Sequence, residues 1–172
     1  MSSGPCITGD SLPLLCHLTS FGFIKFYKEL RKKGIKPICG SDFLLLGENT
    51  NSGNLQLLVK NHKGYKNLIR LISKSHTTGK INGNPFLSVK DLEEYSEGLL
   101  LITGAIDSQI GQSILAGKND IALKQIKYLK NLYKDNFFLQ LTRTGKNQEE
   151  LCNQSLIEFA NELSIPLVAT NQ

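Results

Sequence analysis

The sequence predicts an α/β fold, in which short buried strands alternate with amphipathic helices. Apolar stretches alternate along the 172-residue chain with segments whose apolar residues recur every three to four positions. Residues 98–103 (GLLLIT) are apolar at nearly every position, which is typical of a strand buried on both faces. Because strands that alternate with helices pair in parallel through right-handed crossovers, we expect a parallel sheet.

In the first half of the chain, helical periodicity alternates with short apolar runs. The first predicted helix places Phe23, Phe26 and Leu30 on one inward face and is closed by Gly34. Ser88 is placed to cap a later, shorter helix. We expect strands at residues 12–18, 36–46 and 55–59, helices at 23–33, 65–75 and 88–95, and loops at 47–54 and 77–85.

The second half of the chain repeats this alternation. Its longest helix has Ile121, Ile126 and Leu129 among the residues that we expect to point inward. We expect strands at residues 98–103, 137–141 and 166–170 and helices at 108–116, 120–133 and 148–163. The first and the last of these strands are expected to be fully buried. Chemistry in such folds lies in the loops after the carboxyl ends of the strands, which here include Gly40 to Asp42 and Thr142 to Thr144.

Composition indicates one globular domain without membrane spans. The chain is 40% hydrophobic and 20% charged, and no apolar run approaches the length of about 18 to 20 residues that a bilayer requires. The four cysteines (Cys6, Cys16, Cys39 and Cys152) are widely spaced and form no zinc-binding pattern. We therefore expect reduced thiols and a cytoplasmic location.

Two rows of basic residues recur at helical spacing, and the formal net charge is +5. Each row forms one stripe on a helix, which is either a solvated face or a phosphate-binding surface; the solvated face is the preferred interpretation. The rows are Lys60, Lys63, Lys66, Arg70 and Lys74, and Lys124, Lys127, Lys130 and Lys134. No phosphate-binding glycine loop and no nucleophile elbow accompany them.

Several segments together resemble the PHP domain of the bacterial DNA polymerase III alpha subunit. They occur in the same order as in that family, over roughly residues 12–171. The segments are GIKPICGSDF (34–43), NHKGYKNLIRLISKSH (61–76), EGLLLITGAI (97–106), QLTRTGKNQEE (140–150) and IPLVATNQ (165–172). Collinear agreement over the chain is far more specific than any one of these strings.

The resemblance implies a distorted, seven-stranded (β/α) barrel like the TIM barrel, present here as a partial domain. We expect residues 12–172 to form this single domain and residues 1–11 to be an unmatched segment. The family's first strand, which carries His-x-His, and its first helix have no counterpart upstream of Leu12. We also expect the last motif, Ala-Thr-Asn-Asp-x-His, to be cut short at Asn171 and Gln172.

Active PHP domains hold a cluster of divalent metals with His, Asp, Glu and Cys ligands, and this sequence departs from that pattern. The family's Leu-Thr-Asp-His has Ser20 and Phe21 in its two ligand positions here. Asp42 occupies the position of a glutamate ligand and His76 lies near a further histidine, so these two are the residual metal candidates. We expect no cofactor, with zinc, manganese or magnesium bound only if this site is active.

Each candidate residue has a structural alternative. Asp42 is suited to a carboxylate that is hydrogen-bonded at a strand end, and His76 to the last turn of a helix, where a histidine interacts favourably with the dipole. His17 is more consistent with packing than with metal binding, and His62 with a surface loop. Arg143 is suited equally to a phosphate or partner contact and to a plain salt bridge, and Asn171 is a further candidate for such a contact.

The resemblance implies a part in DNA replication as a non-catalytic scaffold. In that family the domain supports the polymerase and docks the proofreading exonuclease subunit, so these are the expected partners, with DNA contacted only indirectly. The parent family is a DNA-directed DNA polymerase, which is a nucleotidyltransferase. The resemblance implies that the carboxylates of its polymerase active site would lie beyond residue 172, so it stays open whether this chain is itself an enzyme. Two alternatives stand beside the scaffold: a metal-dependent phosphoesterase or 3′–5′ exonuclease, and a truncated fragment without independent function.

Overall fold

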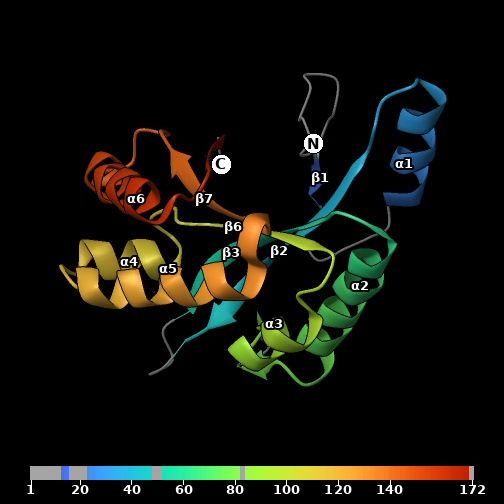
Figure 1. The fold of residues 1–172 in the computed structure, drawn as a ribbon. Coiled ribbons are helices and arrows are strands. Elements are labelled where there is room, and N and C mark those ends of the chain that lie inside the picture. Colours follow the sequence, from blue (N-terminus) through green and yellow to red (C-terminus); the bar gives the residue numbers. More distant parts are fainter. Residues whose placement is uncertain (1–12, 16–22, 48–51, 82–83, 171–172) are drawn as a thin grey trace.

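A six-stranded sheet organises the chain in the computed structural model, which describes residues 13–15, 23–47, 52–81 and 84–170. The strands lie in the order β1-β2-β3-β6-β7-β8, with the helices arranged around them (Figure 1). Their bounds are Pro13–Leu15 for β1, Ile38–Leu46 for β2, Ser52–Val59 for β3, Leu99–Thr103 for β6, Phe137–Thr142 for β7 and Leu167–Thr170 for β8. The predicted α/β class is confirmed.

The expectation of an all-parallel sheet is wrong at β3. Parallel pairs join β1 to β2, β6 to β7 and β7 to β8, but β3 runs antiparallel to both β2 and β6. Only residues 47–51 separate β2 from β3, and a connection this short permits an antiparallel hairpin but not a crossover. The sheet is therefore mixed.

Six helices confirm the six predicted helical segments. Figure 1 shows α2 beside α3 and α4 beside α5. Their bounds are Phe23–Lys32 for α1, His62–Thr77 for α2, Val89–Tyr95 for α3, Gln109–Leu115 for α4, Asn119–Tyr133 for α5 and Glu149–Leu163 for α6. A 3-10 turn, η3 (Lys134–Asn136), follows α5, and the predicted loop at 77–85 contains a small hairpin of β4 (Lys80–Ile81) and β5 (Asn84–Pro85).

Hydrogen-bonding side chains fix where three of the helices begin. Ser88 and Asp91 form a reciprocal capping box at the start of α3, as the sequence predicts for Ser88. Asn61 accepts from the backbone N–H of Gly64 at 3.0 Å at the start of α2, and Ser108 accepts from Gly111 at 2.9 Å at the start of α4. Each cap satisfies a backbone donor that the helix itself leaves unpaired.

The core lies where β3, β6 and β7 meet the helices that cover them. Leu57, Leu99, Leu101 and Leu139 are fully buried on these strands. The helices contribute further buried side chains: Leu68 and Leu71 of α2, Leu92 of α3, Ile110 of α4, Ile126 of α5 and Leu156 of α6. Burial of a large aliphatic side chain contributes about 1.5–3 kcal/mol, so this cluster fixes the centre of the sheet.

Two predictions of buried side chains are wrong, one for α1 and one for β8, both at the edges of this core. On α1 Leu30 is buried, but Phe26 and Tyr27 are exposed, because no described element covers that side of the helix. On β8 none of the four residues is buried, although the strand was expected to be buried. In the described part of the chain β1 and β8 each pair with one neighbour only, so the sheet is open there and its two edges are not joined.

The described cysteines are reduced thiols, as expected. Cys152 is buried and Cys39 is half-buried, and neither forms a disulfide. Burial raises the pKa of the Cys152 thiol to about 11, which keeps it protonated and unreactive at neutral pH. Cys6 and Cys16 lie outside the described residues.

Candidate functional site

The loops after β6 and β7 bring several polar side chains to one edge of the sheet. Thr103 and Thr142, the last residues of these strands, are both buried. Thr103 donates its hydroxyl to the Asn54 carbonyl at 3.2 Å, and Asn153 of α6 donates to the Thr142 carbonyl at 2.8 Å. These contacts connect the strand ends to β3 and α6, so the edge is held by protein hydrogen bonds.

The turn between β7 and α6 is organised around the carboxylate of Glu149. This carboxylate accepts from the backbone N–H groups of Thr144, Gly145 and Lys146 at 2.8, 3.0 and 3.2 Å. The hydroxyl of Thr144 donates to it as well, at 2.7 Å. Consecutive N–H groups that converge in this way form an anion-binding concavity, which here is already occupied by the protein's own carboxylate.

The electrostatics of the turn follow from the same contacts. The side-chain hydrogen bond from Thr144, followed by the backbone hydrogen bonds, holds the pKa of Glu149 below its ordinary value of 4.5, although burial acts in the opposite direction. Glu149 is therefore ionised at neutral pH and satisfies the N–H groups that a phosphate would otherwise contact. Sequence reasoning missed this residue; an acidic side chain in the first turn of a helix, directly after a turn containing Gly145, is the signal that indicates it.

Arg143 lies on the outside of this turn and makes a surface salt bridge. Its guanidinium is 3.1 Å from Glu150, and both side chains are largely exposed. Nearby, Lys146 is 3.1 Å from Asp107 in the loop after β6. A phosphate or partner contact of Arg143 stays a prediction, and Asn171, the other residue predicted for such a contact, lies outside the described residues.

The structure does not bring the two predicted metal candidates to the loops at the strand ends. Asp42 is half-buried in the middle of β2 and opposite Gln56 of β3, rather than at a strand end as expected. The strand does not end at Gly40 and Ser41, although Gly and Ser favour turns, and it continues past Asp42 because residues 43–46 also pair with β3. His76 is half-buried in the last turn of α2, where its favourable interaction with the dipole is expected.

The described residues do not offer a set of ligands that fits a metal cluster. Among residues 13–15, 23–47, 52–81 and 84–170, no three His, Cys, Asp or Glu side chains come together in a metal-binding group. His62 is exposed at the first position of α2, on a helix rather than in the predicted loop. His17, Ser20 and Phe21 lie outside the described residues, so metal binding through Asp42 or His76 stays a prediction.

Most lysines of the two basic rows are engaged within the chain. Lys63 is 3.5 Å from Glu97 and Lys127 is 3.9 Å from Glu162, while Lys60 donates to Asn136 at 2.8 Å. Lys130 donates to the carbonyl of Leu163. These contacts favour a solvated, locally paired face over a continuous phosphate-binding stripe.

Lys74 joins α2 to α3 through two carboxylates. Its ammonium is 2.8 Å from Asp91 and 2.9 Å from Glu94, and it lies over the ring of Tyr95, with its Nζ 5.2 Å from the ring centroid. The hydrogen bond with Asp91, followed by that with Glu94, raises the pKa of Lys74 above its ordinary value. Lys74 thus takes part in the packing of two helices, and its charge is balanced by two carboxylates.

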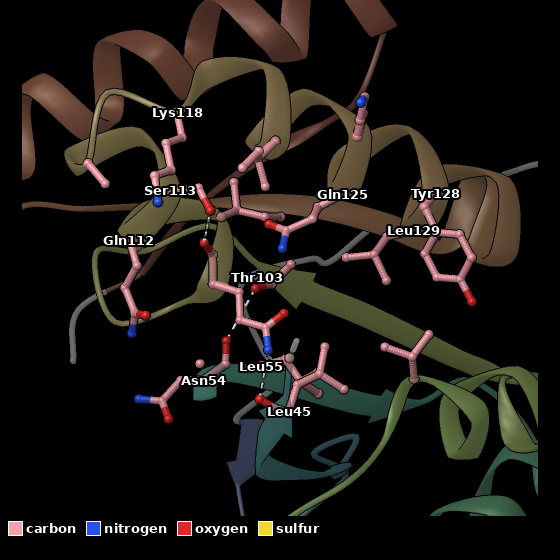
Figure 2. Close-up of a pocket in the computed structure, with 18 residues that line it drawn as sticks. Leu45, Asn54, Leu55, Thr103, Gln112, Ser113, Lys118, Gln125, Tyr128 and Leu129 are labelled. Atoms are coloured by element: carbon pink, nitrogen blue, oxygen red, sulfur yellow. Dashed lines mark hydrogen bonds between the residues drawn. The ribbon is translucent and has the colours of Figure 1, made fainter. Parts of the chain in front are cut away.

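The described part of the chain also contains a cleft that no motif indicates. It has a volume of about 530 Å³ and lies between α5 and the ends of β2, β3 and β6 (Figure 2). Leu45, Leu55 and Leu129 form part of its apolar lining, and Gln125 points into it from α5. The start of α3 and several residues of α4 line it as well, so its walls come from stretches that are widely separated in the sequence, which is why sequence reasoning missed it.

Comparison with known proteins identifies the relatives of this chain. The family described as PHP domain matches residues 6–144. DNA polymerase III subunit alpha of Borreliella burgdorferi is 38% identical over 93% of the chain, that of Vibrio cholerae is 35% identical over 88%, and that of Escherichia coli K12 is 36% identical over 87%. The chain spans 15%, 13% and 13% of the length of these three relatives. No helix in the described part is long and apolar enough to cross a membrane.

Proposed function

Because the chain belongs to the PHP domain family, as its resemblance to that family predicts, we propose that it serves DNA replication as a scaffold domain of a polymerase III alpha type of protein. The observation that carries this proposal is the identity of 33–38% to proteins named DNA polymerase III subunit alpha. The scaffold supports the rest of the polymerase and docks a proofreading exonuclease subunit. Its place of action is the cytoplasm.

The proposed scaffold is part of a distorted seven-stranded barrel. The sheet order β1-β2-β3-β6-β7-β8 supports this proposal, since parallel pairs flank the antiparallel strand β3 and helices cover the outside. Among the described strands β8 pairs with β7 only, so the backbone groups of its other edge are available to the next strand of a closed barrel.

The domain is proposed to be non-catalytic. The sequence supports this, because Ser20 and Phe21 replace an acidic and a histidine ligand of the family's pattern. The distribution of the remaining candidates supports it too, since Asp42 lies within β2 and His76 at the end of α2. A metal cluster that activates water for phosphate hydrolysis needs several close ligands.

Membership in the PHP family favours one rival, a metal-dependent phosphoesterase or 3′–5′ exonuclease that uses Asp42, His76 and further residues. The second rival, a fragment without independent function, predicts that the isolated chain does not unfold cooperatively. A single sharp thermal transition of the purified chain contradicts the fragment.

Docking is tested by titrating the folded chain with the proofreading exonuclease subunit of a bacterial polymerase III and measuring the heat of binding. The scaffold predicts a saturable, one-to-one response. An unrelated protein of similar charge serves as the control, because a chain with a net charge of +5 attracts acidic proteins non-specifically. A flat response from a chain that unfolds cooperatively contradicts the docking role.

A further inference from the structure

The cleft between α5 and the sheet has the size and lining of a small-molecule site. Its volume of about 530 Å³ falls within the range of about 300–1,000 Å³ in which proteins bind small organic ligands. Leu45 of β2, Leu55 of β3 and Leu129 of α5 line it together with Ile121. Ile121 is 46% exposed, although its helical position predicts burial, because its side chain borders this cleft rather than the core.

Gln125 places an amide group in the wall of the cleft. Its Oε1 is buried from solvent, so a ligand in the cleft does not reach that atom. In Figure 2 the side chain extends from α5 into the cleft with its Nε2 group leading. This group donates hydrogen bonds, so a ligand that supplies an acceptor at this position gains affinity.

Two lysines give the cleft a positive charge. Lys118 and Lys124 both line it and are exposed, and neither forms a salt bridge with a residue in the described ranges. Among the described residues, no aspartate or glutamate lines the cleft. Other lysines of α5 are engaged elsewhere, Lys127 with Glu162 and Lys130 with the Leu163 carbonyl. The ligand that complements this wall therefore carries a negative charge.

Tyr128 supplies an aromatic ring at the other end of the cleft. Its hydroxyl donates to Glu93 of α3 at 2.5 Å, which holds the ring in position. The lining of α5 thus changes along the helix from Lys118, through Ile121 and Gln125, to Tyr128. Lys118 and Tyr128 are separated by about 15 Å along the helix axis, at a rise of about 1.5 Å per residue.

We propose that this cleft binds a nucleoside monophosphate. The phosphate lies against Lys118 and Lys124, the base lies between the leucines and Tyr128, and a ring nitrogen or carbonyl oxygen of the base accepts from Nε2 of Gln125. A planar, apolar body with an anionic group at one end and an acceptor at the other meets all three requirements, whereas a fatty acid lacks the acceptor at the far end. This inference does not depend on docking of an exonuclease subunit.

The test titrates deoxyadenosine 5′-monophosphate into the 172-residue chain and follows backbone amide shifts by NMR. We expect saturable shifts in α5 and β3. The double variant Lys118→Met/Lys124→Met is expected to weaken binding by about tenfold or more, as for the loss of charge-assisted contacts. Lys66→Met, which removes an exposed lysine on α2, is the matched control and is expected to leave the affinity unchanged.

Two further titrations separate the parts of the ligand. Deoxyadenosine is expected to bind more weakly than the monophosphate and to be insensitive to the lysine variants, while Gln125→Leu weakens both. Because the two lysines are exposed, the lysine variants are informative even if Gln125→Leu fails to fold. Absence of saturable shifts, equal binding by the lysine variant and Lys66→Met, or equally strong binding of inorganic phosphate alone overturns the proposal.

Discussion

At the scale of single residues, the strongest local organisation lies around Glu149. One carboxylate satisfies three consecutive backbone N–H groups and the Thr144 hydroxyl, so the conformation of the turn depends on a charge that the turn itself encloses. Arg143 and Glu150, its neighbours, are exposed and form a surface pair of the kind that contributes about 0–1 kcal/mol. The two adjacent glutamates therefore have different roles.

We expect Glu149→Gln to lower the melting temperature, because an amide replaces a charged acceptor of four hydrogen bonds. The pKa of Glu149 is lowered in the folded state, so its stabilising contribution is complete above the ordinary value of 4.5 and is lost as the pH falls through the folded pKa. The difference in melting temperature between the wild type and the variant should therefore become smaller as the pH falls through that acidic range. Thermal unfolding across the pH series checks this.

Glu150→Gln is the matched control, and it is expected to change the melting temperature little at any pH. Equal effects of the two substitutions at neutral pH would contradict the role assigned to Glu149.

Tyr133 gives a second prediction at this scale. Its hydroxyl is buried at the end of α5 without a hydrogen-bond partner in the described residues, and burial raises its pKa well above the usual value. Tyr133→Phe is therefore expected to leave the free energy of unfolding unchanged or to raise it by up to about 1 kcal/mol. Tyr128→Phe, which removes the hydrogen bond to Glu93, is expected to lower it. Denaturant unfolding distinguishes the two, and a marked loss of stability in Tyr133→Phe argues against an unpaired hydroxyl.

At the scale of elements, two of the segments that resemble the PHP family contact each other. The start of α2 packs on the turn before β6, where Asn67 donates to the Glu97 carbonyl at 2.9 Å. A Cβ on Gly64 would lie 1.8 Å from the carbonyl oxygen of Gly98, so only glycine permits this approach. The segments 61–76 and 97–106 therefore have a packing role in this fold that requires glycine at position 64.

This contact predicts that Gly64→Ala lowers the free energy of unfolding by about 1–3 kcal/mol, since the added methyl group must displace backbone. Lys66→Ala, two positions along the same helix and exposed, should change it by less than about 0.5 kcal/mol. The comparison is made by denaturant unfolding of both variants. A Gly64→Ala protein as stable as Lys66→Ala would show that α2 does not approach β6 this closely.

At this scale the helices were predictable and the pairing of strands was not. Helical periodicity and caps such as Ser88 are local, so all six helices follow from the sequence. The antiparallel direction of β3 follows from its short connection to β2, a signal that the sequence analysis did not use, whereas the pairing of β3 with β6 joins strands that are far apart in the chain. The position of Asp42 depends on how far the pairing of β2 with β3 extends. The cleft depends on how α4 and α5 lie against the ends of β2, β3 and β6, so no short pattern indicates it.

At the scale of the whole molecule, the central strands of the sheet form a well-packed core. The predicted metal ligands, in contrast, lie on separate elements or outside the described residues. The core of β3, β6 and β7 is continuous, with Leu57, Leu101 and Leu139 fully buried. Asp42 and His76 lie on β2 and α2 and do not join a third ligand in the described ranges. The proposed scaffold role does not require these residues to come together, whereas the rival phosphoesterase does.

The most direct test of this account is elemental analysis of the purified chain, together with hydrolysis of single-stranded DNA and of a phosphomonoester with added manganese or zinc. The account predicts no stoichiometric metal and no turnover, with or without the substitution Asp42→Ala. The account would be contradicted by about two or three tightly held divalent ions per chain together with turnover that Asp42→Ala abolishes. Asp120→Ala, on the exposed face of α5, is the control and should leave such turnover unchanged.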